Sequence, residues 1–250
     1  MMVIVTVSGG LDSLVALALL KASGVKIRPF MIDQGIKSHV YAATLICQHY
    51  ELELDVHDFS STFARLKRCG TNYYAGYRAY SYLTALALAD TWDANCVYTG
   101  ELDAVLASED ANNDPDYQSW LKHLNVGDRV SKEGWHSARQ KFAGVYNYMY
   151  QNDEDGITFI DPLFGMDKPS VIRLGATLNA PLEYSLSCRA SDVDEINDNL
   201  TAPRHCGRHE CWTCNQRKSA FKLSGVKDPT QYSVAEEIGG LYKEYLNAKS

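Results

Sequence analysis

An apolar run leads directly into a glycine-rich turn and then into an apolar helical pattern near the start of the chain. Residues 3–20 read VIVTVSGGLDSLVALALL. A β-branched run that ends in glycines and feeds a helix predicts a strand–turn–helix unit, which is typical of α/β proteins. Adjacent glycines let a backbone approach another group closely, and the first turn of a helix carries unpaired N–H groups and the positive end of the helix dipole. The stretch therefore predicts an anion-binding turn.

This turn differs from the commoner phosphate-binding loops. It lacks the Gly-Lys-Ser/Thr ending of the usual nucleoside triphosphate loop and the three-glycine dinucleotide fingerprint. Asp12 is a candidate Mg²⁺ ligand, and either Asp12 or Ser8 could instead cap the helix of a tight connection that binds nothing. The residues expected to bind phosphate are Ser8, Gly9, Gly10, Leu11, Asp12 and Ser13.

The rest of the chain alternates short β-rich runs with helical patterns. This order predicts an α/β fold with a parallel five-stranded sheet and helices on both faces, in the Rossmann manner. We expect a main domain at 1–180 with an insertion at 101–156, followed by a C-terminal segment at 181–250. The expected strands are 3–7, 25–32, 52–57, 96–99 and 157–160. The expected helices are 12–23, 40–50, 78–92, 117–124, 133–150, 168–178, 215–223 and 234–247.

Composition narrows the class of protein. With 250 residues, 46% of them hydrophobic, the chain can bury a substantial core. The net charge of −7 disfavours nonspecific duplex binding, which rests on lysine and arginine, so we do not expect nucleic acid as a direct partner. No apolar run has the length of a membrane span, and no basic segment precedes an apolar signal core. We therefore expect no membrane association and a cytoplasmic location.

Four of the seven cysteines are concentrated near the C-terminus. Cys206, Cys211 and Cys214 form a C-x4-C overlapping a C-x2-C, and Cys188 precedes them. Four thiolates at such spacings predict a closed, structural zinc site. Unpaired thiols, a redox pair at Cys211 and Cys214, or an iron–sulfur cluster are the alternatives. The remaining cysteines, which we expect to be buried thiols, are Cys47, Cys69 and Cys96.

Taken together, these motifs resemble a known family. The Ser-Gly-Gly-x-Asp-Ser turn resembles the signature of the N-type ATP pyrophosphatases, or PP-loop proteins, which split ATP into AMP and pyrophosphate. With the cysteine cluster added, the chain resembles the QueC (7-cyano-7-deazaguanine synthase) family. Further matches to that family are Asp33-Gln34-Gly35, Gly76-Tyr77-Arg78, Thr99-Gly100, Asp110 with Pro115-Asp116, Pro162-Leu163 with Lys168, and Cys214-Asn-Gln-Arg217.

The resemblance implies a reaction and its participants. An ATP-dependent ligase would adenylate the carboxylate of 7-carboxy-7-deazaguanine, and ammonia would convert it to the amide and then to the nitrile. ATP, Mg²⁺ and Zn²⁺ would be the cofactors, and a homodimer is the implied assembly. Asp33 and Gly100 would join the turn in binding ATP, with Asp12, Arg78 and Lys168 catalytic. The implied substrate-binding residues are Arg78, Glu101, Asp110 and Asp116.

Departures from the family pattern leave other functions open. The family's Gln-Arg-His after Asp-Tyr-Gly is Ile36-Lys37-Ser38 here, its Asn after the helix-opening Arg is Ala79, and its Cys-Arg after Pro-Asp is Tyr117-Gln118. An altered pocket could stop at the amide, or transfer the activated deazapurine to an amine of a protein or a nucleic acid. A tRNA thiolase of the same ATP family would normally need a catalytic cysteine pair near the turn, which is missing here. A zinc-bearing binding module without catalysis is the alternative from another class.

Overall fold

The computed structural model describes most of the chain. The described residues are 2–69, 73–100, 132–149, 156–188, 203–208 and 211–233. The helices expected at 117–124 and 234–247 lie outside these residues, as does most of the insertion expected at 101–156.

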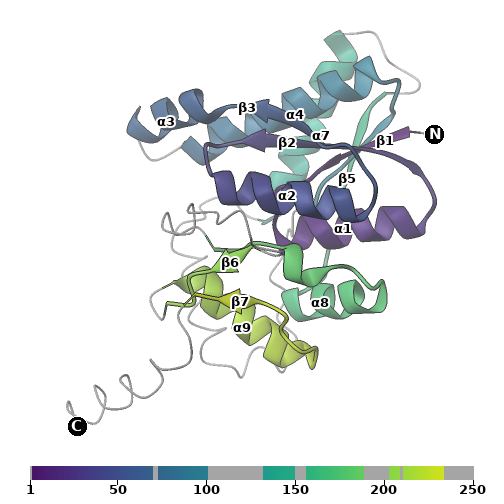
Figure 1. The fold of residues 1–250 in the computed structure, drawn as a ribbon. Coiled ribbons are helices and arrows are strands. Elements are labelled where there is room, and N and C mark those ends of the chain that lie inside the picture. The colour runs from purple at the N-terminus through teal and green to yellow at the C-terminus, as the bar shows by residue number, and fades with distance from the viewer. Residues whose placement is uncertain are drawn as a thin grey trace.

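A five-stranded parallel sheet forms the centre of the molecule (Figure 1). The strand order is β3-β2-β1-β4-β5, and every neighbouring pair is parallel. Strand β1 is the middle strand, and its Val3, Ile4 and Val5 are fully buried because helices cover both faces of a parallel sheet. The strands are β1 (Met2–Thr6), β2 (Lys26–Asp33), β3 (Asp55–Asp58), β4 (Cys96–Tyr98) and β5 (Thr158–Ile160).

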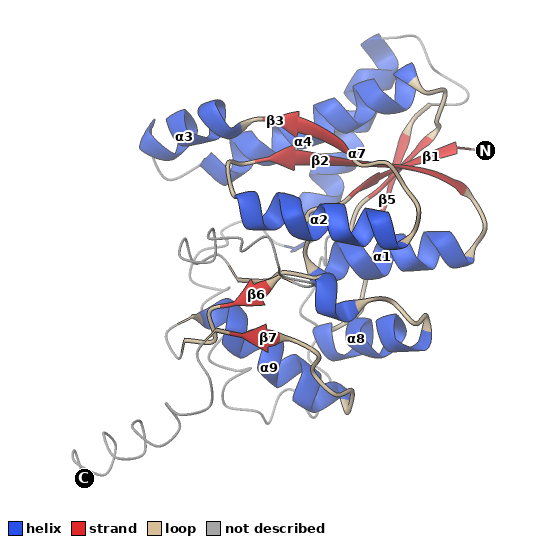
Figure 2. Cartoon of the chain, in the orientation of Figure 1, coloured by secondary structure: helices blue, strands red, loops and turns tan. Residues whose placement is uncertain are grey.

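Helices cover both faces of the sheet, so the predicted fold class is confirmed (Figures 1 and 2). One core cluster joins the sheet to α1 (Leu11–Ala22), α2 (Lys37–His49) and α8 (Lys168–Thr177). The other joins it to α4 (Tyr73–Thr91) and α7 (Lys132–Met149). No helix in the described part of the chain is long and apolar enough to cross a membrane.

A smaller unit follows the sheet and packs through α9 (Trp212–Ser224) against α8. It contains the 3₁₀ turn η1 (Leu182–Tyr184) and a two-stranded parallel ladder of β6 (Arg204–His205) and β7 (Gln231–Tyr232). Figure 1 shows this unit beside α8, on the side of the molecule that carries α1 and α2.

Four parts of the sequence prediction were wrong. Helix α3 (Ser60–Cys69) was not expected, because its apolar face is little more than Phe63 and Leu66. Strand β3 begins at Asp55 rather than at residue 52, and the short strands β6 and β7 lie where loop was expected. Helix α4 begins at Tyr73, five residues before the expected start at Arg78.

The end of β4 touches the beginning of α1, and this contact gives a test of the fold. A Cβ atom on Gly100 would lie 2.5 Å from the Ser13 Cα and 2.6 Å from the Ser13 N, which is closer than side chains pack against backbone. We expect Gly100→Ala to lower the free energy of unfolding by about 1–3 kcal/mol, because backbone must shift to relieve the overlap. Urea denaturation followed by circular dichroism measures the change.

Gly144→Ala is the matched control. Gly144 is an exposed residue of α7, and a Cβ atom there meets nothing within 4 Å. We expect this variant to gain about 0.5–1 kcal/mol, because alanine loses less backbone entropy than glycine in a helix. A Gly100→Ala protein as stable as wild type would contradict the close contact between β4 and α1.

Candidate functional site

The turn between β1 and α1 has the backbone geometry of an anion cradle. Gly9 has a φ of +76°, and a Cβ atom there would lie 2.6 Å from the His39 carbonyl oxygen of α2, so only glycine fits. Gly10 is the N-cap residue of α1 and makes no side-chain capping bond. Neither Asp12 nor Ser8 is therefore the N-cap residue of α1, and the Ser8 hydroxyl accepts from the Gly10 N–H.

Hydrogen bonds between the two serines of the turn fold it onto itself. The Ser13 hydroxyl donates to the Gly10 carbonyl at 3.0 Å and accepts from the Ser8 N–H at 3.2 Å. The Ser8 and Ser13 hydroxyl oxygens are 3.2 Å apart, and the Gly10 N–H points to the Ser8 hydroxyl at 3.4 Å. These bonds hold the turn in one shape before any ligand arrives, which lowers the ordering cost of binding.

Asp12 forms an ion pair with Lys168, which follows it by 156 residues in the sequence. The Lys168 Nζ lies 2.7 Å from Oδ1 and 2.6 Å from Oδ2 of Asp12. Lys168 is the first residue of α8, which begins here because the Asp167 side chain accepts from the Ser170 N–H and Pro169 occupies the first turn. The side chains are 11% exposed at Lys168 and 25% exposed at Asp12, so both groups remain accessible to a ligand.

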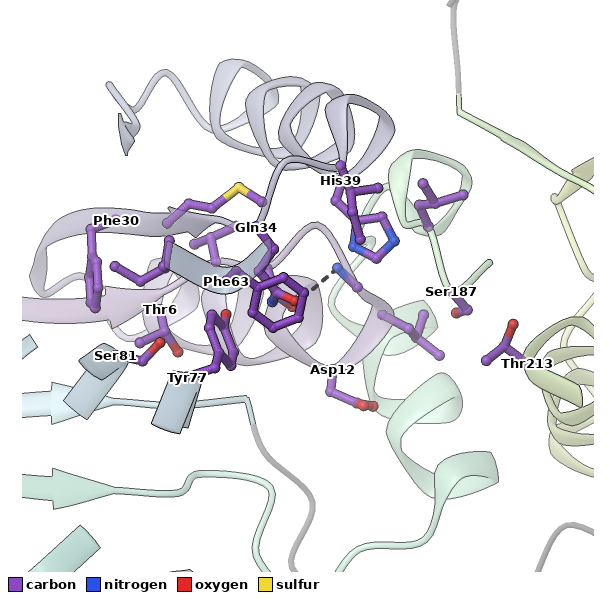
Figure 3. Close-up of a pocket in the computed structure, with 18 of the residues that line it drawn as sticks. Thr6, Asp12, Phe30, Gln34, His39, Phe63, Tyr77, Ser81, Ser187 and Thr213 are labelled. Carbon is purple, nitrogen blue, oxygen red and sulfur yellow. Dashed lines mark hydrogen bonds between the residues drawn. The ribbon is translucent and has the colours of Figure 1, made fainter. Parts of the chain in front are cut away.

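A pocket of about 490 Å³ lies over this ion pair, at the carboxyl ends of β1 and β2. That volume is within the range of small-molecule sites. In Figure 3, Phe30, Phe63 and Tyr77 lie on one side of Asp12, and Ser187 and Thr213 lie on the other. The pocket thus has an aromatic end, formed by β2, α3 and α4, and a polar end, formed by residues near the cysteine cluster.

The structure brings some of the predicted site residues together and places others apart. Ser8, Gly10, Leu11, Asp12 and Lys168 line the pocket. Gly9 and Ser13 belong to the same turn.

The other predicted residues are not among the described residues that line the pocket. Asp33 accepts a hydrogen bond from the Gly35 N–H at 2.7 Å and so shapes the turn after β2. Gly100 packs on Ser13, and Arg78 is half-buried on α4 beside the pocket-lining Tyr77. Glu101, Asp110 and Asp116 lie outside the described residues.

Sequence reasoning missed a buried charge cluster at the ends of β4 and β5. The fully buried Arg139 of α7 forms an ion pair with Asp161, whose carboxylate also accepts a hydrogen bond from Thr99. A buried pair of this kind loses much stability if one partner is removed, because the other charge is left uncompensated. The only signal in the sequence is the position of Asp161 directly after the strand expected at 157–160.

The four cysteines of the C-terminal pattern come together, and we call Cys188, Cys206, Cys211 and Cys214 the tetracysteine cluster. Their sulfur atoms all lie within 4.8 Å of one another. The Sγ atoms of Cys188 and Cys211 are 3.9 Å apart, and those of Cys206 and Cys214 are 3.7 Å apart. A tetrahedral metal with bonds of about 2.3 Å to sulfur requires edges of about 3.8 Å. The donor geometry therefore fits a tetrahedral metal ion.

Burial favours the protonated form of the Cys206 and Cys214 thiols. It raises the pKa of Cys206 to about 11, and hydrogen bonding to the Cys188 thiol, together with burial, raises the pKa of Cys214 further. A metal ion that binds here must displace those protons. His205, a spare ligand candidate, uses its Nε2 to accept the Ser187 N–H at 3.0 Å. Burial and the nearby Arg217 lower the pKa of His205 to about 2, so its ring stays neutral.

Comparison with known proteins identifies relatives of the chain. The family model for the queuosine biosynthesis protein QueC matches residues 78–225, more than half of the chain. The 7-cyano-7-deazaguanine synthase of Chlorobaculum tepidum is 26% identical over 259 residues, covering 94% of this chain and 97% of that protein. The 7-cyano-7-deazaguanine synthase of Methanopyrus kandleri is 45% identical over 71 residues, covering 28% of each chain.

One solved structure supports the fold. A crystal structure of a 4-thiouridine synthetase–RNA complex with bound ATP aligns with a TM-score of 0.50 and 16% identity. The alignment covers 75% of this chain and 43% of that chain. At this identity the likeness concerns the arrangement of the sheet and helices only.

The tetracysteine cluster gives a direct test of metal binding. We expect the purified protein to carry about one transition-metal ion per chain and Cys188→Ala to carry less than about a tenth of that, because one of four thiolates is lost. Elemental analysis by mass spectrometry measures both. Cys96→Ala removes a thiol of β4 outside the cluster and should keep the full metal content. Equal metal content in the two variants would exclude the cluster as the binding site.

Proposed function

Because the chain belongs to the QueC family, we propose that it is an ATP-dependent carbon–nitrogen ligase that activates the carboxylate of 7-carboxy-7-deazaguanine as an adenylate. Ammonia then displaces AMP to give the amide, and a second ATP activates the amide oxygen so that loss of AMP leaves the nitrile. The observation that carries this proposal is the pocket in which the turn at 8–13 and Lys168 lie between an aromatic end and a polar end.

In the proposed complex the triphosphate of ATP lies on the turn. The uncapped start of α1 offers backbone N–H groups and the positive end of the helix dipole, and the Ser8 hydroxyl lies beside them. The adenine ring would then lie toward Phe63 and Tyr77, where half-buried aromatic side chains can pack on a purine. This orientation uses both the charge of the turn and the apolar character of the pocket.

The Asp12–Lys168 pair is proposed to handle the charge that develops on the phosphates. Mg²⁺ held by Asp12 would neutralise phosphate oxygens. Lys168 then stabilises the negative charge on the oxygens of the transition state, since its Nζ already lies at the turn. Arg78 is proposed to act from the α4 side, one residue from the pocket-lining Tyr77.

The remaining predicted residues have proposed supporting roles. Gly100 lets β4 approach Ser13 and so supports the turn, and Asp33 shapes the chain beside Gln34, which lines the pocket. The carboxylates proposed to accept hydrogen bonds from the guanine-like edge of the substrate are Glu101, Asp110 and Asp116.

We assign zinc to the tetracysteine cluster, in a structural role. Four buried or half-buried thiolates leave no open coordination position for a substrate, which is the arrangement of structural zinc sites. The separations of 3.7 Å and 3.9 Å between sulfur atoms support this assignment.

A second candidate function has an observation of its own. Ile36 lines the pocket and stands where the resembled family has a glutamine, so an apolar side chain replaces an amide there. Such a change favours a different acceptor in the second half-reaction. The reaction would then stop at the amide, or an amine of a protein or a nucleic acid would displace AMP from the activated deazapurine.

One experiment separates these candidates. The purified protein is incubated with 7-carboxy-7-deazaguanine, ATP, Mg²⁺ and ammonium, and mass spectrometry follows AMP and every deazapurine species. Free nitrile with about two AMP per product supports the synthase. AMP with amide, or with a deazapurine bound to a macromolecule, supports the second candidate. A complete lack of AMP and pyrophosphate would exclude 7-carboxy-7-deazaguanine as the substrate and leave a ligase for a different acid or a binding module without catalysis.

Lys168→Ala tests the phosphate site within that reaction. We expect the rate of AMP release to fall by about 10²-fold or more, because one positioned cation is lost from the transition state. Lys21→Ala is the control, since Lys21 is an exposed lysine at the other end of α1 and contacts the Tyr50 carbonyl. AMP release at the wild-type rate in Lys168→Ala would remove Lys168 from the catalytic machinery.

A further inference from the structure

Residues 182–188 connect the tetracysteine cluster to the phosphate-binding turn, and we call this segment the strap. We propose that the strap transmits the position of the cluster and of α9 to the turn, with Arg217 as the positioning residue. The inference rests on the proposed ATP site, because the effect that it predicts for the reaction is a change in the affinity for ATP. Its structural part concerns contacts that can be measured without ATP.

The strap holds the turn through backbone atoms. The Leu186 N–H donates to the Gly9 carbonyl oxygen at 2.8 Å. On its other side Gly9 is packed against α2, where a Cβ atom would meet the His39 carbonyl oxygen at 2.6 Å and the Ala42 Cβ at 3.1 Å. Gly9 is therefore clamped between the strap and α2, so a shift of the strap would change the orientation of the turn.

Ser187 and Cys188, the last two residues of the strap, contact β6 and the tetracysteine cluster. The Ser187 N–H donates to the Nε2 of His205 at 3.0 Å, and Cys188 supplies one of the four sulfur atoms. The Cys188 carbonyl oxygen accepts from the Nε2 of His39 at 3.0 Å, so the strap also contacts α2 directly. Successive strap residues thus contact the turn, the ladder strand β6 and the cluster.

Arg217 holds the strap at three of its residues. Its side chain is 1% exposed, and its guanidinium donates to the Leu182 carbonyl at 3.0 Å, to the Ser185 hydroxyl at 2.9 Å and to the Ser187 hydroxyl at 3.4 Å. Arg217 follows Cys214 by three residues in α9, so the two side chains lie on one face of the helix. A shift of the cluster therefore moves α9 and the strap together.

The test compares Arg217→Met with a variant that is destabilised elsewhere. Leu86→Ala opens a cavity in the core between the sheet and α4, outside the strap and the turn. Hydrogen exchange on the nucleotide-free proteins follows the Leu186 amide. We expect its exchange to accelerate by about tenfold more in Arg217→Met than in Leu86→Ala, because only the first variant releases the strap. Equal acceleration in both variants would overturn the structural part of the proposal.

Kinetics and binding test the functional part. We expect Arg217→Met to raise the KM and the Kd for ATP by about tenfold with kcat within about threefold of wild type, and Arg217→Lys to recover part of that loss. Metal content, measured on the same samples, should stay at the wild-type level. A Kd for ATP unchanged in Arg217→Met would overturn the proposal, and so would one raised equally by Leu86→Ala.

Ser185→Ala keeps the proposal testable if Arg217→Met does not fold. This variant removes one acceptor of Arg217 and leaves the guanidinium in place, so we expect a smaller change of about threefold in the same direction. A wild-type protein that does not bind ATP would contradict the proposed function, whereas the exchange of the Leu186 amide would still decide whether the strap is held by Arg217.

Discussion

The turn at Gly9 and Gly10 is held by contacts to three other segments of the chain, all of them made with backbone. The Leu186 N–H bonds to the Gly9 carbonyl, the His39 carbonyl lies where a Gly9 side chain would be, and Gly100 packs on the backbone of Ser13. Because β1 is the central strand, its carboxyl end is where the chain runs to β2 on one side and β4 on the other. Open α/β sheets bind ligands outside the carboxyl ends of their strands, and the pocket lies at that edge, over the ends of β1 and β2.

The positive charge at the turn comes from nearby groups and does not follow the net charge of the whole chain. The chain has a net charge of −7, yet the turn combines a helix N-terminus with the Lys168 ammonium. Asp12 compensates that ammonium directly, so the resting site carries no uncompensated charge in a half-buried position. An anion that binds here gains a cation that is already in place, and a divalent metal gains a carboxylate. In the proposed function the same pair would serve both parts of a metal–nucleotide ligand.

The sequence predicted what is encoded locally and missed what depends on distant pairing. The parallel sheet followed from apolar runs that alternate with helical patterns, and the cysteine spacing indicated a cluster that the structure assembles. The pairing of Arg139 with Asp161 left no pattern in the sequence, because a charge gives no sign of its partner until the fold is known. Helix α3 was missed for a different reason: its ten residues are amphipathic but mostly polar, and only Phe63 and Leu66 pack against the core.

The small unit of η1, β6, α9 and β7, which carries the tetracysteine cluster, contributes residues to the pocket. Its described elements are one helix, the 3₁₀ turn η1 and two strands of two residues each, which is too little to bury a core of their own, so small units of this kind depend on metals. Here Ala42 of α2 and Leu186 of the strap share one apolar cluster with three of the cysteines. Ser187 and Thr213, which line the polar end of the pocket, lie directly beside those cysteines in the sequence. The unit that carries the cluster therefore forms one wall of the pocket, so the packing of the cysteines and the shape of that wall depend on the same residues.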